Sequence, residues 1–318
     1  MSIRSYLGPK KIRSLRPRDY DWLKTFSYEV QEKIDGSQFS FMLEDGVLRC
    51  KSRKVDIVYS VVDGEVVADS SWKGAIQNLI NNIDQIAPGI IYRGEVLRSH
   101  RHNKICYNRA PKGNLVLFEV ESVDGKFLTN STSLANIASQ LGVDYAPFIG
   151  SVKSLSEYTD EAFMDHLENS ESVLGGRMEG VVLKSFQGSW YGYRDGTSVL
   201  IYPSIKFVCP EFMERTHKKT KGKSSIQDYI KDLGDSLKNT NRWDKAIQHL
   251  RESGELTGTV KDIGPLIKEI HTDISLEEDA DLIKLLKRVR KHVLKKSTKG
   301  FAEYYKNMLE ARSPLVEE

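Results

Sequence analysis

Alternating apolar and polar residues run through the first two thirds of the chain and predict short β-strands. Ser37–Leu43 and Val47–Arg53 alternate in this way on either side of Glu44-Asp45-Gly46, a turn sequence that predicts a β-hairpin. Further strands are predicted at Leu115–Glu121, Gly180–Phe186 and Val199–Val208. Because these hairpin signals occur without a regular βαβ rhythm, the pattern favours an α+β fold with antiparallel sheets.

A second pattern, with apolar residues every three or four positions, predicts amphipathic helices. In the mixed part of the chain it predicts helices over residues 72–83, Ser133–Leu141 and Leu155–Leu167. From Ser225 onward almost every segment has this spacing, and the predicted helices there are Ile226–Leu237, Arg242–Arg251, Pro265–Ile270, Leu276–Lys296 and Phe301–Ala311. The chain therefore changes from a mixed part to a helical part.

The boundary between the two parts is a basic, polar stretch, Thr216–Lys223, whose composition is typical of a linker. We therefore expect a mixed domain at residues 1–212, a basic linker at 213–224 and a helical C-terminal domain at 225–318.

The helix predicted at Leu276–Lys296 has the most complete signals. Ser275 and Glu278 could form a capping box, and one apolar stripe is formed by Leu282, Leu286, Val289 and Val293. From residue 282 to 300 the sequence has no acidic residue but many basic ones: Lys284, Lys287, Arg288, Arg290, Lys291, Lys295, Lys296 and Lys299. This basic run reads equally well as a solvated helix face or as a contact surface for phosphates.

The composition of the chain excludes some classes of protein but does not indicate a function. The chain has 318 residues, 39% of them hydrophobic and 29% charged, and its net charge of +3 is too small to indicate a nucleic-acid partner by itself. Cys50, Cys106 and Cys209 lack the spacing of a zinc site and are expected to be reduced thiols. No signal-peptide core and no apolar run of about 20 residues is present, so we expect a cytoplasmic protein without a membrane partner.

Candidate chemistry begins at Lys33, in Lys33-Ile34-Asp35-Gly36. Taken alone, this tetrad more often marks a polar turn than an active site. A lysine nucleophile must be neutral to attack, and burial or neighbouring cations lower its pKa from about 10.4. Lys184 and Lys206, each in an apolar run, are the candidates for such neighbours. Either could instead be a core-strand lysine whose amino group reaches out to water.

Several other residues have types that nucleotidyl transfer needs. Arg53 ends the first hairpin and could contact phosphate, and positive groups of this kind stabilise the charge of phosphoryl transfer. Glu95 and Glu179 each lie beside a glycine and could accept bonds from a ribose or help hold Mg²⁺, or could simply be strand-end acids in water. Phe118 could stack on a base or be a core aromatic.

Together these clusters resemble the covalent nucleotidyltransferase superfamily of ATP-dependent ligases and mRNA capping enzymes. The matching segments, in order, are Lys33-x-Asp35-Gly36, Ser52-Arg53, Gly94-Glu95, Leu117-Phe118-Glu119-Val120, Glu179-Gly180-Val181-Val182-Leu183-Lys184 and Ile205-Lys206. They cover about residues 30 to 210. The N-terminal position of Lys33 and the helical C-terminal part are most similar to the phage RNA ligase 2 type, because DNA ligases and capping enzymes carry an OB-fold there.

The resemblance implies an α+β fold, in which an antiparallel-sheet, ATP-grasp-like ligase domain precedes an all-helical C-terminal domain. It also implies an ATP-dependent, AMP-forming RNA ligase with Mg²⁺, for which Mn²⁺ could substitute. Lys33 would form a lysyl-AMP, the AMP would pass to an RNA 5′-phosphate, and a 3′-hydroxyl would then displace it. Such an enzyme would repair or join RNA, in the cytoplasm or in a host cytoplasm if it is viral.

Residue roles follow from the same resemblance. Asp35 and Gly36 would shape the nucleophile loop, and Glu32 would lie near the adenine edge through its backbone. For the remaining positions the implied roles are Arg53 on phosphate, Glu95 on ribose, Phe118 on adenine, Glu179 on Mg²⁺, and Lys184 and Lys206 on the phosphates.

One departure from the family pattern and several alternatives stay open at this level. The last motif usually reads Lys-x-Lys, but here it is Ser204-Ile205-Lys206, so a phosphate contact is missing or supplied elsewhere. The alternatives are a DNA ligase, a capping-type guanylyltransferase or a catalytically silent nucleic-acid-binding relative. The partner is expected to be RNA, with DNA or RNA/DNA duplex ends as alternatives, and the sequence indicates no protein partner.

Overall fold

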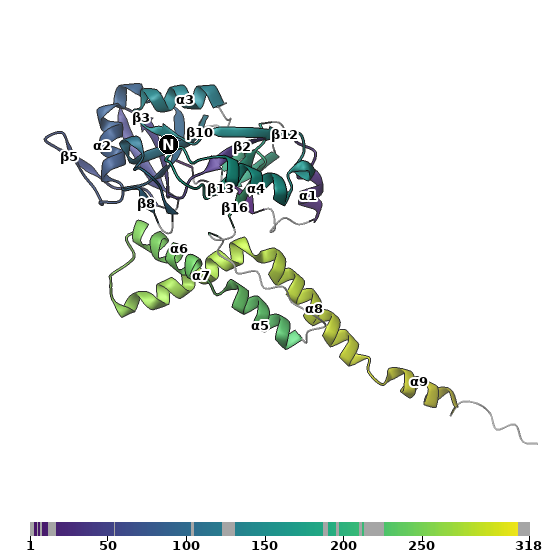
Figure 1. Ribbon diagram of the computed structural model, residues 1–318. Helices are drawn as coiled ribbons and strands as arrows, with labels where there is room; N and C mark the ends of the chain where they lie inside the picture. Colours follow the sequence, from purple (N-terminus) through teal and green to yellow (C-terminus); the bar gives the residue numbers. More distant parts are fainter. Residues whose placement is uncertain are drawn as a thin grey trace, which may run out of the picture.

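The described part of the protein is built mainly from two five-stranded sheets, the helices that pack on them and a group of C-terminal helices (Figure 1). The computed structural model describes residues 3–4, 6, 8–11, 17–53, 55–102, 105–122, 131–186, 190–194, 197–209, 212 and 226–310. The sheets are largely antiparallel and lie in the first part of the chain, whereas the described residues 226–310 contain no strand. The α+β class and the helical C-terminal region predicted from the sequence are therefore confirmed.

The first sheet has the strand order β1-β16-β13-β2-β12 and is antiparallel except where β1 runs parallel to β16. Its strands are β1 (Lys10–Lys11), β2 (Tyr28–Lys33), β12 (Phe148–Val152), β13 (Gly180–Lys184) and β16 (Ser204–Val208). Strand alternation directs Val30, Val181 and Leu183 to one face, where they are buried in a single apolar cluster. Residues of α1 (Pro17–Leu23) and α4 (Asp160–Asn169) complete that cluster.

The second sheet has the order β11-β10-β7-β3-β4, and only its β10–β11 pair is parallel. Its strands are β3 (Ser37–Glu44), β4 (Val47–Ser52), β7 (Ile90–Val96), β10 (Leu115–Ser122) and β11 (Asp144–Tyr145). Phe39, Phe41 and Leu117 are fully buried on the face covered by α2 (Lys73–Asn81) and α3 (Ser131–Gln140). The predicted β3–β4 hairpin is confirmed.

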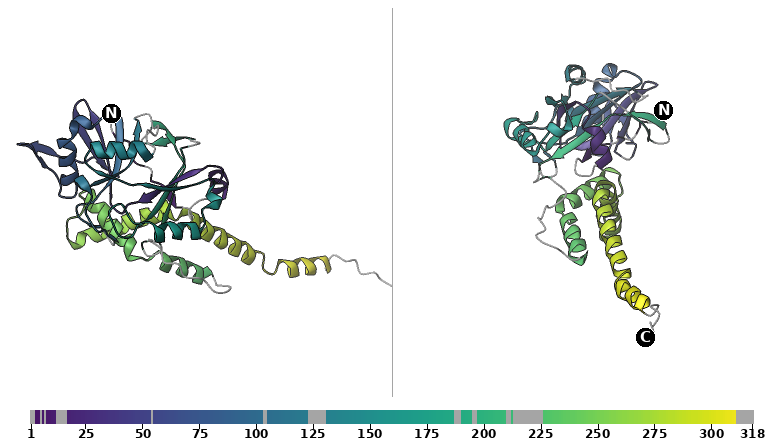
Figure 2. Two further views of the ribbon diagram at one scale, coloured as in Figure 1. Left: turned by 45° about the horizontal axis from the view of Figure 1, so that its top comes forward. Right: turned by 90° about the vertical axis from the view of Figure 1, so that its right-hand side faces the viewer.

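The two sheets meet through the faces that these helices do not cover (Figure 2). Gln31 of the first sheet donates from Nε2 to the carbonyl oxygen of Phe118 in the second, over 3.2 Å. Lys184 reaches the same carbonyl oxygen from β13, over 3.1 Å. Because strand alternation puts the apolar side chains on the outer faces, the polar residues of both sheets are brought together between them.

Shorter elements complete this part of the chain. They are the strands β5 (Ser60–Val62), β6 (Glu65–Val67), β8 (Arg101–His102), β9 (Ile105–Cys106), β14 (Trp190–Arg194) and β15 (Thr197–Ile201), with the 3₁₀ turns η2 (Ile83–Gln85), η3 (Lys112–Asn114) and η4 (Leu155–Glu157).

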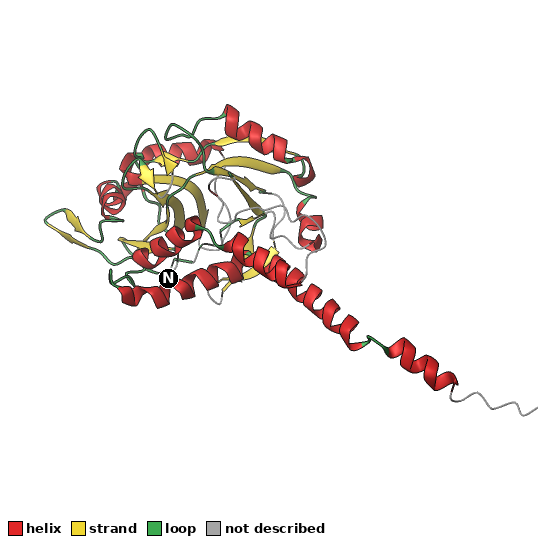
Figure 3. Cartoon of the chain, turned by 60° about the horizontal axis from the view of Figure 1, so that its bottom comes forward, coloured by secondary structure: helices red, strands yellow, loops and turns green. Residues whose placement is uncertain are grey.

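The C-terminal helices lie beside the sheets and then lead away from them (Figures 1 and 3). They are α5 (Ile226–Leu237), α6 (Thr240–Glu252), α7 (Ile263–Glu277), α8 (Asp279–Ser297) and α9 (Phe301–Glu310), with the 3₁₀ turn η6 (Val260–Asp262) before α7. Arg242 of α6 is fully buried and pairs with Asp273 and, over 2.9 Å, with Glu278. This ion pair cluster holds α6 against the end of α7.

Several predicted elements differ from the structure, among them the helix expected at Pro265–Ile270, which is the longer α7. The helix expected at Leu276–Lys296 is interrupted at Glu278, whose carboxylate is committed to Arg242. The predicted capping box is therefore wrong: Ser275 lies inside α7 and its hydroxyl donates to the His271 carbonyl oxygen. The helix predicted at Leu155–Leu167 is split because Thr159 caps a new start, accepting from the backbone nitrogen of Ala162.

The strand predicted at Val199–Val208 is likewise split, into β15 and β16. The predicted linker at 213–224 lies outside the described residues. Within the described part of the chain, no helix has the length and apolarity needed to cross a membrane.

Candidate active site between the two sheets

Lys33 is the last residue of β2, and the chain turns there from the first sheet into the second. The turn is tight at Gly36, where a Cβ atom would lie 2.8 Å from Cβ of Glu95 and 3.2 Å from the Val96 carbonyl oxygen. Asp35 fixes the turn by donating its backbone N–H to the Tyr107 hydroxyl over 2.9 Å. A side chain at residue 36 would therefore displace the loop that carries Lys33.

The amino group of Lys33 lies 2.5 Å from Oε2 of Glu179. Burial disfavours its charge, but Glu179 and Glu95 outweigh burial, so the pKa of Lys33 is raised. The expectation that neighbouring cations would lower this pKa is wrong, because the sheets bring carboxylates next to Lys33 instead. Burial raises the pKa of Glu179 to about 7 even though Lys33 opposes the shift. Glu179 is thus the nearest group that can take a proton from Lys33.

Glu95, on β7, is the second carboxylate near Lys33. Burial raises its pKa well above the usual range, and the charge of Lys33 opposes that shift. Its Oε2 atom is buried with no hydrogen-bond partner among the described residues. The glycines beside the two acids allow another group to approach the backbone closely, as the sequence predicted. That group is the neighbouring strand: a Cβ atom at Gly94 would lie 2.7 Å from the Val116 carbonyl oxygen.

The two acids also fit a magnesium site of the kind that uses substrate phosphates. The described residues contain no group of three His, Cys, Asp or Glu side chains able to hold a metal ion. Mg²⁺, however, is usually held by one or two carboxylates together with phosphate oxygens and water. Glu179 and Glu95, with an unsatisfied buried oxygen on Glu95, match that mode.

A set of buried charges lies deeper between the sheets, around Lys184. Its amino group is 3.2 Å from Oε2 of Glu119 and 5.0 Å from the centre of the Phe118 ring. Burial lowers the pKa of Lys184 and raises that of Glu119. The alternative that Lys184 reaches out to water is wrong, since it points into the space between the sheets.

Arg93 and Glu121 complete this set and were not identified as site residues from the sequence. Arg93 is completely buried, pairs with Glu121, and lies 3.6 Å from Glu119. The sequence does contain a pattern that could have identified them. Arg93 with Glu95, and Glu119 with Glu121, are charged residues at alternate positions of otherwise apolar strands, so each pair lies on one face of its strand.

Phe118, predicted to stack on adenine, is partly buried at an irregularity of β10. The Tyr6 ring lies 5.3 Å from it, and the Arg93 guanidinium lies 5.3 Å from the Tyr6 ring. Tyr6 is thus a further aromatic residue of the site that the sequence did not indicate.

Glu32 lies apart from this polar space. Its backbone N–H donates to the Pro147 carbonyl oxygen and its carboxylate accepts from the backbone nitrogen of Val173, both over 3.0 Å. Burial raises the pKa of Glu32 to about 7, although hydrogen bonds to its carboxylate from Ser172 and from the Val173 backbone act to lower it.

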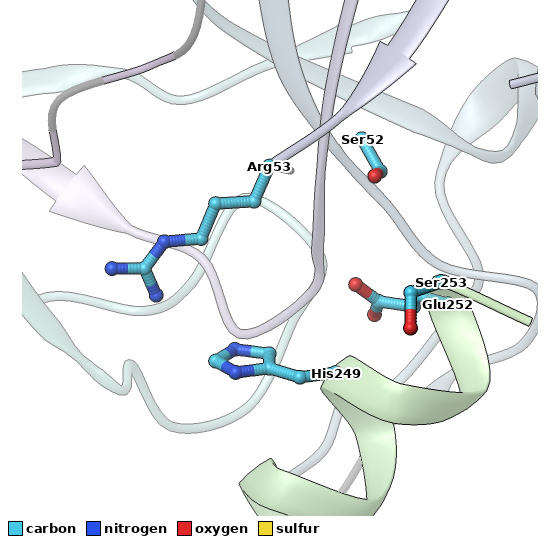
Figure 4. Close-up of a pocket in the computed structure, with 5 residues that line it drawn as sticks. All are labelled: Ser52, Arg53, His249, Glu252 and Ser253. Carbon is cyan, nitrogen blue, oxygen red and sulfur yellow. The ribbon is translucent and has the colours of Figure 1, made fainter. Parts of the chain in front are cut away.

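Lys206 and Arg53 face the C-terminal helices. Lys206 lies 3.5 Å from Oε1 of Glu277, which also pairs with Lys245 over 3.2 Å. Arg53 lines a small pocket together with Ser52, His249, Glu252 and Ser253 (Figure 4).

The same helices contact the loop of the candidate nucleophile. Ser37, four residues after Lys33, donates its hydroxyl hydrogen to Glu252 and accepts a bond from Gln248 over 3.1 Å. The C-terminal region therefore contributes carboxylates to the edge of the site, through residues that no pattern in the sequence singles out.

A sequence model of the RNA ligase family matches residues 26–208, more than half of the chain, and this range includes Lys33, Glu179 and Lys184. The chain belongs to the RNA ligase family. No curated protein sequence matches it. Among solved structures, it is similar to mutant RNA ligases of Naegleria gruberi solved with ATP and Mn and with AMP and Mn, each at 18% identity and a TM-score of 0.45. The alignments cover 66% of this chain and 57% of the Naegleria chains, so this family member spans less than two thirds of their length.

Proposed function

We propose that this protein is an ATP-dependent RNA ligase that joins 3′-hydroxyl and 5′-phosphate ends through a lysyl-AMP at Lys33. The observation that carries the proposal is the 2.5 Å contact between Lys33 and Glu179, in a buried site of an RNA ligase family member. A lysine becomes a nucleophile when a neighbouring base takes its proton.

In the first step, Lys33 passes a proton to Glu179 and its nitrogen attacks the α-phosphorus of ATP. A phosphoramide bond forms, the bond to the bridging oxygen breaks, and pyrophosphate leaves. The AMP is then transferred to an RNA 5′-phosphate, which regenerates the lysine. A 3′-hydroxyl finally attacks the activated phosphate, so that the strand is sealed and AMP is released.

The other residues bind and orient in this proposal. Lys206 and Arg53 contact phosphates, Glu95 bonds to the ribose, and Phe118 stacks on adenine. Lys184 neutralises charge from within the buried set, while Asp35 and Gly36 hold the loop and Glu32 supports the adenine side. Glu95, joined by Glu179 once that carboxyl has released its proton, would hold Mg²⁺ or Mn²⁺, which would offset the negative charge of the phosphates.

We further propose the domain division and partners suggested by the sequence. Residues 1–212 would carry the chemistry and residues 225–318 would contact RNA, with DNA at one strand end as an alternative. The exposed basic residues of α8 support a polynucleotide partner. Cys50, Cys106 and Cys209 form no disulfide bond among the described residues, which is consistent with the reducing environment of a cytoplasm.

The test is to incubate the protein with Mg²⁺ and ATP or GTP labelled at the α-phosphate, and to measure label bound to protein. We expect label from ATP alone, and none for Lys33→Ala. Lys24→Ala is a matched control, because Lys24 is an exposed lysine paired with Asp21. Label from GTP would indicate a capping-type enzyme, and no label from either nucleotide would indicate a silent relative.

A further inference from the structure

We propose that α8 and α9 form an arm that binds a single-stranded segment of RNA, with phosphates along α8 and bases stacked on an aromatic platform of α9. The platform is Phe301, Tyr304 and Tyr305. This inference rests on the proposed function, which supplies RNA as the substrate. It adds that the bound RNA segment is single-stranded and that it contacts a surface outside the site between the sheets.

The platform is unusual in its exposure. The exposed fractions of Phe301, Tyr304 and Tyr305 are 59%, 66% and 46%. The three residues lie at positions i, i+3 and i+4 of α9 and so share one helix face. The Phe301 and Tyr305 rings are 6.0 Å apart with planes only 16° from parallel, and the Phe301 and Tyr304 rings are 6.5 Å apart. Large aromatic side chains normally bury such area, whereas flat exposed rings bind unpaired bases.

The phosphate-binding part of the arm is α8. All of its lysines and arginines from Lys284 onward are exposed, and the sequence from 282 to 300 contains no acid. With 19 residues the helix is about 28 Å long. It projects from the body of the protein and carries α9 at its far end (Figure 3). Basic residues over this length suit an extended, negatively charged backbone.

Charge decides between RNA and a second copy of the chain as the occupant. The exposed apolar residues Leu286 and Val293 on α8 could in principle pair with another α8. Two such helices would bring two runs of positive charge together, and like charges repel. An RNA strand removes this repulsion and also uses the aromatic rings, which a helix pair does not require.

The position of the arm agrees with a strand that leads to the candidate active site. Glu277, the last residue of α7, pairs with Lys206 of that site, and α8 begins two residues later at Asp279. The root of the arm is therefore at the site, and its aromatic end lies far from it. Stacking requires unpaired bases, so the arm should prefer a single strand to a duplex, in which the bases are already stacked on one another.

The test compares a fluorescent oligouridylate with a duplex of equal length, measured by anisotropy on the full-length protein. In one variant Phe301, Tyr304 and Tyr305 are all replaced by Ala. We expect its affinity for the single strand to fall about tenfold or more, while its affinity for the duplex changes less than threefold. A second variant with Leu at all three positions keeps apolar area but lacks flat rings, and should lose the same affinity. Because the rings are exposed, both variants should melt at the wild-type temperature.

Three results would overturn the inference. They are unchanged single-strand affinity in the Ala variant, equal losses for single strand and duplex, or full retention of affinity in the Leu variant. A wild-type dimer that the Ala variant converts to a monomer in sedimentation would assign the surface to a second copy. Labelling of Lys33 by ATP is measured in parallel. Loss of RNA binding with intact labelling is expected, whereas absent labelling in the wild type would count against the proposed function and not against the arm.

Discussion

Charged residues are used in opposite ways in the two regions of this protein. Between the sheets, Arg93, Lys184 and Glu119 are almost completely buried, and each contacts a residue of opposite charge. On α8 and in the turn that follows it, the basic residues from Lys284 to Lys299 are exposed to solvent. The free energy and the pKa of a buried charged group depend on the particular residues around it. An exposed charge acts mainly through the summed electrostatic potential of the surface, which salt screens. A single substitution should therefore have a large effect between the sheets, whereas on α8 several charges must be changed together to produce one.

The largest effect is expected for Glu179→Gln, which removes the proton acceptor of Lys33. The rate of lysyl-AMP formation should fall by about two to four orders of magnitude. In the wild type the rate should rise through about pH 7, because Glu179 must be ionised to accept a proton and its pKa is raised to about 7. That rise should be missing from the variant. Single-turnover labelling between about pH 5.5 and 8.5 measures both.

Glu157→Gln, on the exposed surface, is the control for Glu179→Gln and should keep the wild-type profile. Wild-type labelling rates in Glu179→Gln would show that another group takes the proton.

The next effect concerns stability and tests how far a buried charge depends on its neighbours. Arg93→Met removes the guanidinium that Glu119 and Glu121 share, so that these buried acids keep only their more limited contacts with Lys184 and Arg4. The free energy of unfolding should fall by about 3 to 5 kcal/mol. Urea denaturation measures it. Arg49→Met, which breaks the more exposed pair with Glu44, should change stability by less than about 1 kcal/mol. Similar losses for both variants would contradict the distinction.

The exposed region is tested by reversing four charges along α8 and the turn that follows it, in the variant Lys287→Glu, Lys291→Glu, Lys295→Glu and Lys299→Glu. We expect RNA affinity at low salt to fall about tenfold or more, and the dependence of log K on log salt to become shallower by about 0.7 for each phosphate that is no longer neutralised. Lysyl-AMP formation should be unchanged, and its loss would show that the helix is structural. The control reverses four exposed lysines elsewhere: Lys73, Lys112, Lys153 and Lys268.

The smallest effect is expected where the two regions meet. Glu277→Gln removes the carboxylate that lies 3.5 Å from Lys206. If Lys206 binds phosphate, Glu277 competes with the phosphate for its amino group. The KM for ATP in labelling should therefore fall in the variant, by only about two- to fivefold because an ion pair of this kind is weak. Asp21→Asn removes an exposed partner of Lys24 and should leave this KM unchanged. A higher KM in Glu277→Gln would show that the pair supports the site.

The order of the chemical motifs along the chain could be predicted from the sequence. The contacts that folding makes between residues far apart in the sequence could not. Local patterns predicted the β3–β4 hairpin because its turn, with Asp45 and Gly46 at positive φ, is specified by adjacent residues. They did not predict the contact between Ser37 and Glu252, which are 215 positions apart. Nor could they predict that Lys33 would lie among acids, since this depends on which sheet faces meet.

The helix break at Glu278 has the same origin. The amphipathic pattern continues through this position, and the local capping signal of Ser275 and Glu278 predicts a helix start at Leu276, three residues before α8 begins. The break coincides with the ion pair between Glu278 and Arg242, a residue 36 positions earlier. Tertiary contacts thus overrode a correct local periodicity. The ends of α8 do follow a local rule, because its first turn is acidic and its last turn is basic, the arrangement that the helix dipole favours.

The contacts at Lys206 and Ser37 make the docking of the C-terminal helices part of the energetics of the site. Any ligand that draws Lys206 away from Glu277 changes the free energy with which the two regions dock. By thermodynamic linkage, whatever favours or opposes that docking changes the affinity of the ligand by the same factor. A force or a strand acting on the distant end of α9 is therefore transmitted to nucleotide binding to the extent that it alters this one interface.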